Sequence, residues 1–89
     1  MKVKFSSRSI AHIANIRDFL ARENPQVAEL VRLRILASIK RLQKFPGIGH
    51  PGRAEDTREV RVSGLPFIIV YRVKARITIL AVFHIAQDR

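Results

Sequence analysis

The chain has 89 residues, no cysteine and a formal net charge of +10, from 17 Lys and Arg side chains against seven Asp and Glu. The lack of cysteine excludes disulfides and thiolate metal sites. Hydrophobic residues make up 47% of the chain, which is enough for a core and too many for a disordered segment. A positive field this strong attracts polyanions such as nucleic acid, an acidic protein or an anionic membrane surface.

Length and patterning predict a single domain over residues 1–89. The N-terminus turns polar at Ser6, so it does not resemble a signal peptide. No apolar run approaches the ~18 residues that a membrane span needs. We therefore expect a cytoplasmic protein with no membrane partner. The three histidines are scattered and the glycines form no phosphate-binding pattern, so we expect no metal and no cofactor.

The first half of the chain predicts a strand followed by two helices. Residues 2–5 alternate in polarity, and Ser6 and Ser7 follow as good helix caps. Asn24-Pro25 then ends one helix, predicted over residues 8–23, and starts the next, predicted over 25–45. So short a connection makes the helices antiparallel neighbours. Their apolar stripes are Ile10, Ile13, Ile16 or Arg17, and Leu20 in the first helix, and Ala28, Val31, Ile35, Ile39 and Leu42 in the second.

The second half predicts a loop and three strands. Residues 45–57 are dense in Pro and Gly, and strands are expected over 57–62, 67–73 and 76–85. The predicted fold class is α+β: a strand, an antiparallel helical hairpin and a three-stranded antiparallel meander, forming one mainly antiparallel four-stranded sheet. Strict alternation in the last strand places Ile77, Ile79, Ala81, Phe83 and Ile85 on one face, and Leu80, Val82 and His84 on the other. Both faces are apolar, and one hairpin covers only one of them, which favours a partner site.

Five segments in this order resemble the RelE/ParE toxin family and together span nearly the whole chain. They are Asn24-Pro25, residues 42–49 (LQKFPGIG), 57–62 (TREVRV), 67–73 (FIIVYRV) and 79–87 (ILAVFHIAQ). The resemblance implies a toxin neutralised by a cognate antitoxin whose extended and helical part wraps it. The candidate antitoxin-binding residues are Leu30, Leu33 and Ala37 of a second apolar stripe on the longer helix, together with the basic residues Arg34 and Arg41.

Two activities compete within that family. RelE-like members resemble ribosome-dependent mRNA endoribonucleases, whose partners are the ribosome and mRNA, whereas ParE-like members poison DNA gyrase and are not known as nucleases. RNA cleavage needs a base, an acid and fixed positive charge at one phosphate. The candidates for that chemistry are Arg58, Arg72 and His84.

Departures from the nuclease pattern favour the ParE-like branch. Nuclease members typically carry Arg or Lys in the middle of the strand that here reads FIIVY, and they often end in a catalytic His or Tyr. Here the strand is apolar, and His84 is followed by Ile85 and Ala86. A lone histidine in this place is more often structural. The predicted function is gyrase binding, with target-binding candidates Arg58, Arg61, Arg72, Leu80, Val82, His84, Gln87 and Arg89.

Overall fold

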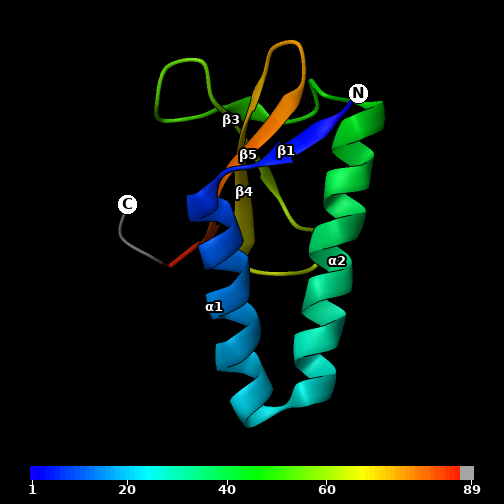
Figure 1. The fold of residues 1–89 in the computed structure, drawn as a ribbon, viewed down its shortest axis with the longest axis vertical. Coiled ribbons are helices and arrows are strands. Elements are labelled where there is room, and N and C mark those ends of the chain that lie inside the picture. Colours follow the sequence, from blue (N-terminus) through cyan, green and yellow to red (C-terminus); the bar gives the residue numbers. More distant parts are fainter. Residues whose placement is uncertain (87–89) are drawn as a thin grey trace.

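The computed structural model describes residues 1–86 of the chain, and Figure 1 shows two helices beside a sheet. The sheet has the order β1-β5-β4-β3-β2, with β1 parallel to β5 and the other pairs antiparallel. The predicted α+β fold is confirmed. The elements are β1 (Val3–Phe5), α1 (Ser7–Glu23), α2 (Pro25–Lys44), β2 (His50–Pro51), β3 (Arg58–Arg61), β4 (Phe67–Val73) and β5 (Ile77–His84).

The sheet differs from the expectation by one strand, because β2 forms inside the Pro/Gly loop. His50 pairs with Glu59, and Pro51 with Arg58. A two-residue strand leaves no alternation to read in the sequence. Its proline is tolerated because β2 lies at the edge of the sheet, where a missing N–H donor costs no ladder hydrogen bond.

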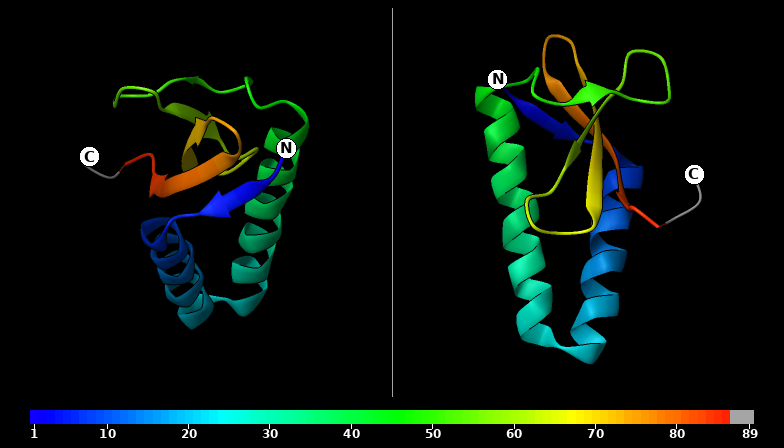
Figure 2. Two further views of the ribbon diagram at one scale, coloured as in Figure 1. Left: turned by 45° about the horizontal axis from the view of Figure 1, so that its top comes forward. Right: turned by 180° about the vertical axis from the view of Figure 1, so that it is seen from behind.

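Side-chain caps fix the two helices as predicted. The hydroxyl of Ser6 accepts a hydrogen bond from the Ser9 N–H at 3.0 Å at the start of α1. The Asn24 side chain accepts from the amides of Gln26 and Val27 at the start of α2, where Pro25 occupies the first turn. The helices run antiparallel, side by side, on one side of the sheet (Figure 2).

The core lies between α2 and the sheet. The predicted stripe of α2 is confirmed, because its five members are the buried residues of that helix. Four of them, all except Ala28, belong to one cluster with sheet residues that are fully buried, among them Ile69, Tyr71, Ile77 and Ile79. The stripe predicted for α1 is wrong at Ile10, which is 57% exposed. Ser9 is buried instead, because the start of α1 hydrogen-bonds to the edge of β5 and turns Ile10 outward.

A bulge in β5 overturns the predicted faces of that strand. Val70 pairs with Ala81 but the next residue, Tyr71, pairs with Ile79, so Leu80 is an extra residue. An extra residue shifts the alternation by one position. Val82 and His84 therefore lie on the helix-facing side with Ile77 and Ile79, whereas Ala81 and Phe83 lie on the outer side. The prediction that Leu80, Val82 and His84 share a face is wrong.

Candidate functional site

The helical hairpin extends beyond the sheet (Figure 1). Side chains of both helices and of the sheet line an apolar groove there. Its volume is about 650 Å³. The sheet ends before the hairpin does, so apolar side chains near the hairpin tip have no strand to cover them, and Phe19 is 61% exposed. The groove is lined by Asn15, Ile16, Phe19, Leu20, Val27, Val31, Leu65, Pro66, Phe67 and His84.

The predicted antitoxin-binding residues continue from the α2 wall of this groove. Leu30 and Arg34 each follow a groove residue, Val27 and Val31, by three positions, so they lie next to them on the helix surface. Leu30 and Leu33 are about half exposed, and Leu36, which the sequence did not single out, is exposed as well. Ala37 and Arg41 are also exposed. The five predicted residues thus form a surface contiguous with the groove.

Polar side chains of α1 hold its position against the sheet. β1 ends at Phe5, which leaves the edge of β5 without a neighbouring strand beyond Ile79. The Ser6 hydroxyl donates to the Leu80 carbonyl at 3.0 Å, and the His12 Nδ1 accepts from the Val82 N–H at 3.1 Å. Burial, and secondarily the nearby Arg8 guanidinium, lower the pKa of His12. The neutral ring that this favours is the form that can accept the Val82 hydrogen bond.

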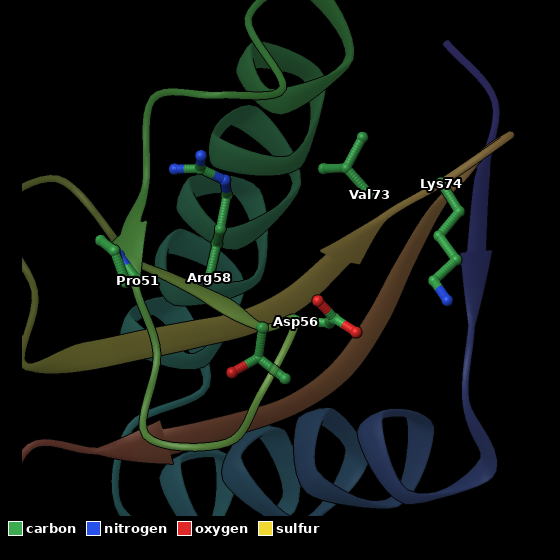
Figure 3. Close-up of a pocket in the computed structure, with 6 residues that line it drawn as sticks. Pro51, Asp56, Arg58, Val73 and Lys74 are labelled. Atoms are coloured by element: carbon green, nitrogen blue, oxygen red, sulfur yellow. The ribbon is translucent and has the colours of Figure 1, made fainter.

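A second hollow, of about 450 Å³, lies at the other end of the sheet (Figure 3). Its lining residues are Pro51, Asp56, Thr57, Arg58, Val73 and Lys74. The Arg58 guanidinium donates to the carbonyls of Gly47, at 3.4 Å, and Gly49, at 2.6 Å. Arg58 therefore holds the Pro/Gly loop to β3.

Tyr71 fixes the same loop from the core. Its hydroxyl donates to the Pro46 carbonyl at 2.8 Å and accepts from the Gly49 N–H at 2.9 Å. Glu59 secures the far half of the loop: it is 4% exposed, and its carboxylate accepts from the Arg53 N–H at 3.3 Å. The buried carboxylate was not predicted from the sequence, because β3 alternation alone gives no sign that the loop covers the outer face there.

The three nuclease candidates are not brought together. On β4, Arg58 pairs with Tyr71 and His84 pairs with Phe67. Tyr71 and Phe67 are four residues apart, so Arg58 and His84 are separated by ~13 Å along the strand direction, at 3.3 Å per residue. Arg72 follows Tyr71 directly and points to the opposite face. His84 also has structural contacts: its ring lies edge-on to Phe67 at 5.5 Å, and its Nδ1 accepts from the Ala86 N–H at 3.0 Å.

The other target-binding candidates are scattered as well. The Arg61 Nε donates to the Leu65 carbonyl at 3.0 Å and braces the turn between β3 and β4. Leu80 is half-buried at the bulge. Val82 belongs to the core at 2% exposure, so it has no surface to offer a target. Gln87 and Arg89 lie outside the described residues.

Two groups of residues at these sites were not predicted from the sequence. The first group lines the apolar groove and consists of Phe19, Val27 and the turn at Leu65 and Pro66. The one sequence feature that indicates this groove is the position of the apolar Phe19 on the polar face of α1. Lys4, Lys74 and Arg76 line a third hollow together with Arg72, Ala75 and Thr78. Only the pairing of β1 with β5 shows that Lys4 belongs there.

Residues 1–86 contain no group of three His, Asp or Glu side chains placed to hold a metal ion. Within that range, neither helix combines the length and the apolar character needed to cross a membrane.

Comparison with known proteins identifies the family. The family described as "ParE toxin of type II toxin-antitoxin system, parDE" matches residues 3–89. The chain belongs to the ParE toxin family. It is 30% identical over 87 residues to "Putative toxin Y4kP" of Sinorhizobium fredii (strain NBRC 101917 / NGR234), covering 98% of this chain and 91% of that protein.

A solved structure supports the same assignment. The structure described as "Chromosomal ParDE TA system from P. aeruginosa" superposes with a TM-score of 0.84 at 26% identity, over 94% of this chain and 95% of that chain. This ParE-type chain is therefore a toxin of a type II toxin–antitoxin system, and its partner is an antitoxin.

Proposed function

We propose that this ParE-type toxin arrests growth by binding DNA gyrase, without cleaving RNA, and that its antitoxin neutralises it by occupying the apolar groove. The gyrase target follows from the resemblance to the ParE-like branch. The observation that carries the proposal is the separation of Arg58, Arg72 and His84 over two faces and two ends of the sheet. General acid–base cleavage needs such groups within reach of one phosphate.

The outer face of β4 supports the same conclusion. At its middle stand Ile68 and Val70, which pair with Phe83 and Ala81 on β5. Where nuclease members carry a cation, this chain therefore presents apolar side chains. An apolar, half-buried sheet face suits contact with a protein better than stabilisation of a developing phosphorane.

The gyrase proposal is tested by adding purified toxin to a gyrase supercoiling reaction. The expected result is loss of supercoiling or accumulation of cleaved DNA, reversed by the antitoxin. In parallel, toeprinting of a translated mRNA should show no new cuts. No effect on gyrase at stoichiometric excess would contradict the proposal. New mRNA cuts that disappear in His84→Ala or Arg72→Ala would establish the RelE-like nuclease activity in its place.

The groove proposal is tested with two matched substitutions in α1. Phe19 and Ile10 are both large, exposed apolar residues of that helix, but only Phe19 lines the groove. Buried aromatic anchors dominate helix-in-groove interfaces. Phe19→Asp should weaken antitoxin binding by about 100-fold or more, whereas Ile10→Asp should change it little. Equal losses of affinity in the two variants, measured by titration calorimetry, would place the antitoxin elsewhere.

A further inference from the structure

Four cationic side chains surround one hollow on the outer face of the sheet. The hollow has a volume of about 310 Å³ and is lined by Lys4, Arg72, Lys74, Ala75, Arg76 and Thr78. Lys4 pairs with Thr78 between β1 and β5, and Arg72 pairs with Thr78 between β4 and β5. Paired residues of neighbouring strands point to the same face, so Lys4, Thr78 and Arg72 form a row across three strands. Two cations thus flank one hydroxyl group.

The lining of this hollow contains four cations and no acidic residue. The Arg17–Asp18 and Arg32–Glu29 ion pairs lie on the helices, so neither involves a lining residue of the hollow. Like charges gathered around one hollow repel each other, so the fold holds them together at a cost in free energy that a bound anion would offset.

We propose that this basic hollow binds the phosphodiester backbone of nucleic acid. A guanidinium fork, ammonium groups and a hydroxyl are the side-chain groups that contact phosphate oxygens. The hollow is open to solvent, so it suits successive phosphates of a polymer that passes across it. Lys74 also lines the neighbouring hollow of Figure 3, whose lining includes the acidic Asp56, so the cluster of cations without an acidic neighbour is confined to the hollow between β1 and β4.

The composition of the lining separates nucleic acid from an acidic protein segment. Ala75 is its only side chain without a polar group, so a peptide would find no apolar anchor of the kind that gives protein interfaces their affinity. Such anchors lie in the apolar groove instead. The lining also contains no aromatic ring on which a base could stack. Binding is therefore to the backbone, independent of base sequence and strongly dependent on salt. This proposal stands apart from gyrase binding.

Fluorescence anisotropy of the full-length chain tests the proposal with three probes: a random-sequence 20-bp DNA duplex, a single-stranded RNA and a poly-glutamate peptide. The hollow variant is Arg72→Gln with Lys74→Gln. The matched control is Arg17→Gln with Arg22→Gln, which removes the same net charge from exposed positions of α1. Thermal melting verifies that both variants fold. Titrations between 50 and 200 mM salt give the dependence of affinity on ionic strength.

The hollow variant should bind duplex DNA or RNA at least about 10-fold more weakly than wild type. Its salt slope for the duplex should fall by roughly 0.9 for each phosphate that the variant no longer neutralises. The control should bind no more than about threefold more weakly than wild type. The relative affinities for duplex DNA and RNA show which of the two the hollow prefers.

Three results would overturn the proposal. An equal loss of nucleic-acid affinity in the hollow variant and the control would show that binding depends on the net charge of the protein and not on the hollow. Binding of poly-glutamate as tight as that of nucleic acid would assign the hollow to acidic protein segments. No binding of either nucleic acid at 50 mM salt would leave the hollow without this ligand.

Discussion

The apolar groove and the basic hollow lie on opposite faces and at opposite ends of one sheet. Phe67 and His84 reach the groove from the helix-facing side, whereas Arg72 and Thr78 reach the hollow from the outer side. The groove lining contains no Lys, Arg, Asp or Glu, whereas the hollow is lined by four cations. The two proposals therefore concern separate surfaces, an apolar one for the antitoxin and a basic one for nucleic acid.

The two regions are also held in place by different kinds of polar contact. At the end of the sheet that carries the basic hollow, but on the opposite face, the buried Tyr71 hydroxyl bonds two backbone groups of the Pro/Gly loop. Near the groove, α1 is tied to the edge of β5 by Ser6 and by His12, whose pKa is lowered by burial and by the nearby Arg8. The loop contact should therefore be costly to break. The α1 contact should be cheaper to break and sensitive to pH.

The largest effect is expected from Gly49→Ala. A Cβ on Gly49 would lie 2.6 Å from the Tyr71 hydroxyl oxygen and 2.8 Å from the Glu59 carbonyl oxygen. The Glu59 carbonyl belongs to the sheet backbone and cannot yield easily, so the variant should lose about 3 kcal/mol of unfolding free energy. Gly47→Ala is the control, because its Cβ would meet nothing within 4 Å. Urea denaturation followed by circular dichroism measures both.

The same pair of variants tests whether the two regions share one cooperative core. Tyr71 belongs to the cluster that also contains Val31, which lines the groove. Gly49→Ala should therefore lower the unfolding midpoint of helix and sheet together. Separate unfolding transitions for the loop end and the hairpin would mean that the two regions unfold independently.

A smaller effect is expected from Tyr71→Phe. Removal of the hydroxyl leaves the Gly49 N–H and the Pro46 carbonyl without their partner while the ring keeps its place in the core. The expected loss of unfolding free energy is about 1–2 kcal/mol. Because the helical hairpin is untouched, antitoxin affinity measured below the melting range should stay within about twofold of wild type. A large loss of that affinity would show that the loop end and the groove are coupled.

The sequence predicted local features better than features that depend on pairing. The α2 stripe and the Asn24-Pro25 joint follow from spacing and capping within a few residues, and both are confirmed. The bulge at Leu80 could not be foreseen, because an extra residue in one strand shows only against its partner. The predicted faces are therefore reversed from Ala81 to His84. Val82, which was predicted on the side that needs a partner, lies in the core.

The candidate sites were predicted less well for the same reason. The exposure of Phe19 depends on how far the hairpin extends past the sheet, which no single element reveals. Lys4 joins the basic hollow only through the parallel register of β1 with β5. The α2 surface, by contrast, could be predicted from the periodicity of one helix, and it lies beside the groove.

The smallest effect concerns His12 and isolates the contact on the groove side. Its lowered pKa means that, below about pH 6.5, the unfolded chain takes up a proton more readily than the folded chain. The stabilising contribution of His12 is therefore complete above that pH and is lost as the pH falls toward the folded-state pKa, when protonation of Nδ1 breaks the bond to the Val82 N–H.

His12→Asn supplies the matched control, because the Asn oxygen can take the place of Nδ1 as acceptor but does not titrate in this range. The difference in melting temperature between wild type and His12→Asn should change by a few degrees between pH 7.5 and 5.0, with wild type losing more. The other titrating groups are common to both proteins and cancel in that difference. Parallel melting curves over the whole range would mean that the α1 contact does not sense pH, and the contrast with the loop contact would then rest on burial alone.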